Sequence, residues 1–153
     1  MPDVSVYVFS SKNITNIWAG YGAETWAVAI GSETTNKGKK TKAAKMPVGS
    51  FGLLYCEPWK AFTVPFVTCS EADPLNTESE IWEGQWMLPF RFRALGSPRH
   101  RLAGHEILSL PGAKERGTTN YANYLTVQGN FAFQPSSIDQ RDWHALVSQL
   151  VGK

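Results

Sequence analysis

The chain has 153 residues, of which 42% are hydrophobic and 18% are charged, and its formal net charge at pH 7 is +2. This length and composition are typical of one globular domain with a substantial core, so we expect a single domain over residues 1–153. No apolar run is long enough to cross a bilayer, and the N-terminus lacks the basic start and apolar centre of a secretory signal. These features predict a cytoplasmic protein that does not contact a membrane.

The first part of the chain predicts two strands, one amphipathic helix and a loop. Residues 4–9 and 26–30 have the composition of strands. Between them, Asn13 is a candidate helix N-cap. The apolar residues that follow it have the spacing of one buried helix face: Ile14, Ile17, Trp18 and Tyr21. We therefore expect Trp18 in the core. The segment 31–45 is rich in glycine, threonine and lysine and is expected to be a loop.

The middle of the chain predicts three more strands, at 51–55, 61–69 and 86–95. Pro65 and Pro89 each indicate a bulge or a sheet edge. In the last of these strands, alternation places Phe90 and Phe92 inward and two arginines outward. An acidic loop, 71–79, precedes it.

The last third predicts mainly loops over 96–123, with at most a short helix, and then a hairpin or bent strand over 124–133 that turns at Gly129. A final helix is expected to begin near Ser136 or Ser137. Its apolar face is Trp143, Leu146, Val147, Leu150 and Val151. About six short strands with helices near both ends predict an α+β fold, a small curled mixed β-barrel with flanking helices.

The residues that could carry catalysis or bind a metal are few and scattered. Cys56 and Cys69 lie in strand-like surroundings and are expected to be buried thiols, and the three histidines have no metal-ligand spacing. The sequence contains no Ser-His-Asp or Cys-His arrangement, phosphate-binding loop or paired-carboxylate motif. We therefore expect a binding domain without catalytic residues, metal or cofactor.

Trp82 and Trp86 stand in a polar, glycine-containing segment just before the strand at 86–95. A tryptophan is costly to expose, so a Trp-x-x-x-Trp pair outside an obvious core strand indicates the wall of a pocket for a flat ring. The basic residues are clustered and could attract a polyanion, although such clusters are more often solvated surface. Trp59 could pack or lie at a pocket edge, and we favour packing.

Four segments together resemble the PUA-like superfamily, and within it the EVE and YTH-like modified-base readers. They are Glu24-Thr25-Trp26-Ala27-Val28, the turn and strand 47–55, the Trp82…Trp86…Phe90-Arg91-Phe92 stretch, and the tail 128–135 that runs into Asp142-Trp143. The resemblance covers nearly the whole chain. It implies a curled barrel that holds a flipped-out base in an aromatic pocket, with Trp26, Trp82 and Trp86 as walls.

The function that the resemblance implies is recognition of a methylated or hydroxymethylated base in DNA, which would target a nuclease or NTPase carried on another segment or chain. An RNA reader of methyladenine and a peptide-binding domain are the alternatives. The base edge would be read by small polar residues, for which the candidates are Ser10, Ser11, Asn16 and Asn120. The candidates for phosphate contacts are Arg91, Arg93, Lys12, Arg99, Arg101, Lys39, Lys40 and Lys42.

Overall fold

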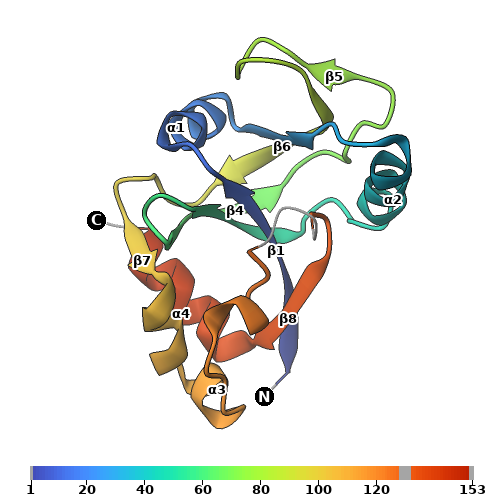
Figure 1. Ribbon diagram of the computed structural model, residues 1–153. Helices are drawn as coiled ribbons and strands as arrows, with labels where there is room; N and C mark the ends of the chain where they lie inside the picture. Colours follow the sequence, from blue (N-terminus) through green and yellow to red (C-terminus); the bar gives the residue numbers. More distant parts are fainter. Residues whose placement is uncertain (1, 128–131, 152–153) are drawn as a thin grey trace.

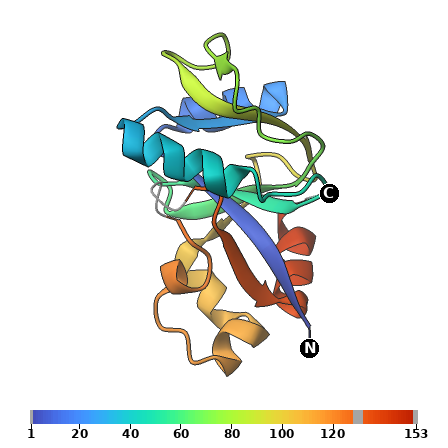
Figure 2. The same ribbon diagram turned by 90° about the vertical axis from the view of Figure 1, so that its right-hand side faces the viewer.

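The computed structural model describes residues 2–127 and 132–151 of the chain (Figures 1 and 2). Its strands are β1 (Asp3–Ser11), β2 (Thr25–Ala29), β3 (Phe51–Cys56), β4 (Ala61–Thr68), β5 (Thr77–Glu78), β6 (Trp86–Ala94), β7 (Arg101–Ala103) and β8 (Pro135–Asp139). Its helices are α1 (Ile14–Ala23), α2 (Glu33–Ala43), α3 (Pro111–Glu115) and α4 (Gln140–Leu150), with short 3₁₀ turns η1 (Gly104–Ser109) and η2 (Tyr121–Asn123).

The strands form one mixed, curled sheet in the order β2-β6-β4-β3-β1-β8, with β5 added to β6 and β7 added to β4. The β1–β3 pair is parallel and the other pairs are antiparallel. Within the described residues no pairing joins β8 to β2, so the sheet stays open. Figure 1 shows α1, α2 and β5 around the upper part of the sheet and α3 and α4 below it. The predicted α+β fold, a curled sheet with flanking helices, is confirmed.

Two bulges bend β4 and β6 where the prolines predict them. Val64, just before Pro65, and Leu88, just before Pro89, have φ angles of 46° and 57°. The pairing register shifts beside each, in β3–β4 and in β2–β6. A bulge increases local bend and twist, so these two positions let the sheet curl around its apolar interior.

The apolar interior forms two clusters. The first contains Phe9, Trp26, Trp82, Phe90 and Phe92, and the two phenylalanines of β6 are 1% exposed, as predicted. The second lies against α4 and includes Trp143, Leu146 and Leu150. Trp143 stacks on Phe51 of β3 with 4.9 Å between ring centroids, which anchors α4 to the sheet.

Helix α1 begins as predicted, because the Asn13 side chain accepts a hydrogen bond from the backbone N–H of Asn16. The prediction for its buried face is wrong in part. Ile17 is fully buried, but Trp18 is 40% exposed and Ile14 is also exposed. Trp18 contacts Tyr21 edge-on at the helix surface, so the small face that packs inward is centred on Ile17 and Gly20.

The prediction of a loop over 31–45 is wrong, since most of this segment is helix α2. Ser32 caps the helix by accepting a hydrogen bond from the Thr35 N–H at 3.2 Å, and Glu33 follows in the first turn. Lys40 and Lys42 lie in the last turn, where positive charge favours the helix dipole. The capping residue and charge order outweigh the unfavourable propensity of Gly38 and the threonines.

The C-terminal boundary is also corrected. Residues 135–139 form β8, antiparallel to β1, and α4 begins at Gln140 instead of near Ser136 or Ser137. Asp139 is the N-cap and accepts from the Arg141 N–H at 2.8 Å. Of the predicted hairpin, residues 124–127 form no strand, and its turn at 128–131 lies outside the described residues.

Cys56 is buried, but Cys69 is exposed, which corrects the expectation of two buried thiols. Within residues 2–127 and 132–151, no group of histidine, cysteine and carboxylate side chains is arranged to hold a metal ion. None of the helices in this part of the chain combines the length and apolar character needed to cross a bilayer.

Candidate nucleic-acid interface

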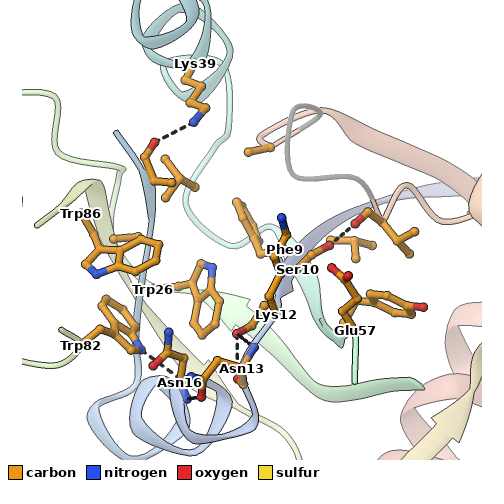
Figure 3. A pocket seen from close by; sticks show the side chains of 18 of the residues that line it. Phe9, Ser10, Lys12, Asn13, Asn16, Trp26, Lys39, Glu57, Trp82 and Trp86 are labelled. Atoms are coloured by element: carbon orange, nitrogen blue, oxygen red, sulfur yellow. Dashed lines mark hydrogen bonds between the residues drawn. The ribbon is translucent and has the colours of Figure 1, made fainter. Parts of the chain in front are cut away.

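A cavity of about 880 Å³ opens between β1, the start of α1, β2 and the loop that precedes β6 (Figure 3). Its aromatic side is formed by Trp26, Trp82 and Trp86. The opposite side is formed by the C-terminal half of β1 and the turn after β3. The turn after β3 and the loop before β6 are far in sequence from β1, α1 and β2, so the cavity exists only in the assembled fold.

Trp26 is held on β2 by a close approach of α1. Its side chain is 5% exposed, and a Cβ built on Gly20 would lie 2.6 Å from two ring carbons, Cε3 and Cζ3. Only a glycine leaves room for the indole at this distance. The helix therefore fixes the position of Trp26 from behind.

Trp82 and Trp86 come from one irregular turn, in which Gly84 has φ of +87°. Trp82 is 6% exposed and donates its indole N–H to the Asn16 carbonyl at 3.0 Å. Trp86 is half-buried and donates to the Glu83 carbonyl at 3.0 Å. Both indole N–H groups are thus satisfied internally, and the apolar ring surfaces are what the turn presents to the cavity.

The three rings form a corner. Trp26 and Trp82 are 5.3 Å apart between centroids with planes inclined at 75°, and Trp82 and Trp86 are 6.0 Å apart at 62°. Two steeply inclined indole rings can contact the face and the edge of one planar ligand at the same time. Such a corner can therefore hold a flat ring whose edge carries an apolar substituent.

Polar residues from β1 and α1 complete the cavity. The Ser10 hydroxyl donates to the Val127 carbonyl, and the Ser11 hydroxyl donates to the Asn13 carbonyl at 2.8 Å. Both serines line the cavity with their hydroxyl groups already used. The side-chain amide of Asn16 also lines it and forms no hydrogen bond with any described residue, so it is available to a ligand.

Three charged side chains line the cavity: Lys12, Lys39 and Glu57. Lys39 reaches down from α2 and donates to the Ala29 carbonyl at 2.7 Å (Figure 3). Partial burial lowers the pKa of its ammonium group. Lys12, which follows β1, is exposed and forms no ion pair with a described carboxylate.

The other predicted site residues lie elsewhere. Asn120 caps η2 by accepting from the Ala122 N–H at 3.0 Å and does not line the cavity. The remaining six basic candidates are also not among the lining residues: Lys40, Lys42, Arg91, Arg93, Arg99 and Arg101. Arg91 and Arg93 are exposed on β6, and neither pairs with a carboxylate of the described acidic loop.

Sequence reasoning missed several lining residues, among them Glu57, Tyr55 and Asn13. Asn13 carried a signal, because a helix N-cap next to a predicted pocket strand is itself near the pocket. Glu57 and Tyr55 carried none, since they reach the cavity through the parallel pairing of β3 with β1, where Ser10 lies opposite Tyr55.

We compared this fold with solved structures. The Pho92 YTH domain in complex with m6A matches with a TM-score of 0.62 and 11% identity, over 98% of this chain and 85% of that one. The fold is that of YTH domains. The YTH domain of Zygosaccharomyces rouxii MRB1, in complex with N6-methyladenosine RNA, matches with a TM-score of 0.59 and 13% identity, over 97% and 88% of the two chains.

The Toxoplasma CPSF4 YTH domain, in complex with a 7-mer m6A-modified RNA, matches the same YTH fold with a TM-score of 0.55 and 14% identity, over 97% of this chain and 91% of that one. No protein-family model matches the sequence, and no curated protein is significantly similar to it. At these identities the likeness concerns the fold, and the case for function depends on the side chains of the cavity.

Proposed function

We propose that this domain binds a methylated base in RNA, with N6-methyladenine as the leading candidate, by enclosing the base in the tryptophan-lined cavity. The observation that carries the proposal is the corner of Trp26, Trp82 and Trp86 on one side of a cavity of about 880 Å³. This volume is within the range of small-molecule sites, about 300–1,000 Å³.

The energetics of base capture fit this arrangement. A base must leave its stack to enter a cavity, which costs a few kcal/mol unless the strand is already unpaired. Stacking on an aromatic side chain returns roughly 1–3 kcal/mol per base. Two or three indole walls can therefore offset extrusion, and single-stranded RNA avoids most of that cost.

Selectivity for the methyl group needs both shape and a polar contact. Burial of one methyl group contributes about 0.8 kcal/mol, which corresponds to roughly fourfold in affinity. Asn16 supplies the polar contact in this proposal, because its free amide can donate to a ring nitrogen and accept from an N–H on the same base edge. One of the inclined tryptophan rings would contact the methyl group.

RNA is favoured over the DNA target expected from the sequence. The three similar structures described above hold m6A, N6-methyladenosine RNA and an m6A-modified RNA, and DNA is named for none of them. A nuclease or NTPase partner, also expected from the sequence, receives no support from these neighbours. Lys12 at the open rim is placed to contact an RNA phosphate, whereas Lys39 is already engaged with the Ala29 carbonyl.

The test is a competition titration with four matched 7-mers: RNA and DNA, each with adenine or N6-methyladenine at the centre. We expect methylated RNA to bind roughly 10- to 200-fold more tightly than unmodified RNA, the range for one well-fitted methyl group. Equal affinity for the methylated and unmodified forms would reject the proposal. Tighter binding of methylated DNA would restore the DNA target, and binding of none of the four would leave the peptide-binding alternative.

A further inference from the structure

A second aromatic feature lies beside the cavity, in the turn between β3 and β4. The guanidinium carbon of Arg101 lies over the ring of Trp59, 4.0 Å from its centroid. Trp59 is half-buried and packs against the cluster that contains the cavity tryptophans, but it does not itself line the cavity. The exposed Arg101 side chain thus places its guanidinium group over an indole that packs on the core.

Backbone contacts fix this turn to the cavity. The Glu57 N–H donates to the Ser11 carbonyl at 2.9 Å, and both residues line the cavity. The turn closes through the Lys60 N–H to the Glu57 carbonyl at 3.0 Å. Glu57 and Trp59 are two residues apart, so their backbones are separated by at most about 7 Å. The backbone of Trp59 is therefore close to that of Glu57, which lines the cavity.

The strand that carries Arg101 is fixed to the same turn. The Gly104 N–H donates to the Lys60 carbonyl at 2.8 Å, and Arg101 lies opposite Thr63 in the β4–β7 pair. The guanidinium group forms no ion pair with any described carboxylate. Its charge is therefore not neutralised by a described carboxylate, and its described aromatic contact is with the Trp59 ring.

We propose that Arg101, stacked on Trp59, is the platform for the nucleotide next to the one in the cavity. A planar guanidinium can stack on a base with its outer face while its N–H groups reach the adjoining phosphate. The occupant is the neighbouring base of a single-stranded RNA that has already placed its modified base among the tryptophans. This inference rests on the proposed function and adds a second, sequence-tolerant contact to it.

The stacked geometry distinguishes this role from simple attraction of a polyanion. Lysine keeps the positive charge of arginine but has no plane on which a base can stack. Arg99, which is also exposed and lies two residues before Arg101, provides a matched control. Trp59→Phe keeps an aromatic support beneath the guanidinium group.

The experiment compares two ligands, N6-methyladenosine as the free nucleoside and a methylated RNA 7-mer. We expect Arg101→Lys to weaken binding of the 7-mer by roughly 5- to 150-fold, the range for one lost base stack, and to leave nucleoside affinity unchanged. Arg99→Lys should change neither affinity, and Trp59→Phe should keep most of the 7-mer affinity. An abasic sugar at one position next to the methylated base should remove the difference between wild type and Arg101→Lys.

Two results would overturn the platform while leaving the proposed function intact. One is a 7-mer affinity that Arg101→Lys does not change. The other is an equal loss caused by Arg99→Lys, which would mean a general charge effect. Failure of the wild-type protein to prefer the methylated 7-mer over its unmodified form is a separate result, and it would reject the proposed function itself. Unchanged nucleoside binding serves as the check that each variant is folded.

Discussion

Replacing Trp86 by alanine should remove an aromatic contact to the ligand while leaving most of the folding stability in place. Trp86 is half-buried, and its indole N–H bonds only to the Glu83 carbonyl within its own turn. Trp82 is 6% exposed and tied to α1, so its replacement by alanine would cost about 3–5 kcal/mol of folding stability. Trp86→Ala therefore tests binding with the least disturbance of the fold.

The expected magnitude follows from the stacking contact that is lost. One base–aromatic stack contributes roughly 1–3 kcal/mol, so affinity for methylated RNA should fall about 5- to 150-fold. The fall should be smaller for unmodified RNA, because that ligand lacks the methyl group that we propose the corner encloses. The preference for the methylated form should therefore shrink as well.

The assay is a fluorescence-anisotropy titration of labelled methylated and unmodified 7-mers, with thermal denaturation of each variant alongside. Trp18→Ala is the matched control, because Trp18 is a tryptophan outside the cavity, 40% exposed on the surface of α1. It should leave both affinities unchanged. An intact preference in folded Trp86→Ala protein, or an equal loss in Trp18→Ala, would refute the reasoning.

Three further outcomes are expected. Gly20→Ala should weaken binding and lower the free energy of unfolding by about 1–3 kcal/mol, because the new Cβ would displace Trp26. Unchanged affinity in a titration would show that the position of Trp26 does not depend on the glycine. Lys12→Gln should weaken binding of methylated and unmodified RNA alike and flatten the slope of log affinity against log salt by about 0.7, and an unaltered slope would exclude a phosphate contact. Tyr124→Phe should lower the free energy of unfolding in urea by about 1–3 kcal/mol without affecting binding, because the tyrosine hydroxyl donates to the buried Asp142 carboxylate at 2.5 Å. An unchanged unfolding midpoint would show that the carboxylate finds another donor.

The features that the sequence predicts well are those with a local physical cause. Alternation places Phe90 and Phe92 inside, the capping amide of Asn13 begins α1, and the bulges fall at Pro65 and Pro89. Each depends on residues within a few positions of one another. A single sequence contains that information directly.

The features that the sequence does not predict depend on partners far along the chain. Helix α2 has almost no apolar face, so periodicity could not reveal it, and only its cap and charge order indicate it. Trp18 has the spacing of a core residue, but its side chain is 40% exposed and contacts Tyr21 of the same helix. Strand β8 forms because β1 offers it an edge, which no pattern within residues 135–139 encodes.

The candidate site was predictable in its aromatic part and much less so in its polar part. Trp26, Trp82 and Trp86 meet in one cavity, and Ser10, Ser11, Lys12 and Lys39 also line it. Asn120 and most of the basic candidates do not. The charges of a lysine or arginine cluster are visible in a sequence, but the face of the fold on which they lie is not.

The most direct test of the central claim is a two-dimensional NMR titration of the six tryptophan indole N–H signals with N6-methyladenosine nucleoside. A base enclosed in the cavity should shift the signals of Trp26, Trp82 and Trp86 and leave those of Trp18 and Trp143 in place, with unmodified adenosine producing much smaller shifts at the same concentration. Shifts confined to tryptophans outside the cavity, or equal shifts with both nucleosides, would contradict the account.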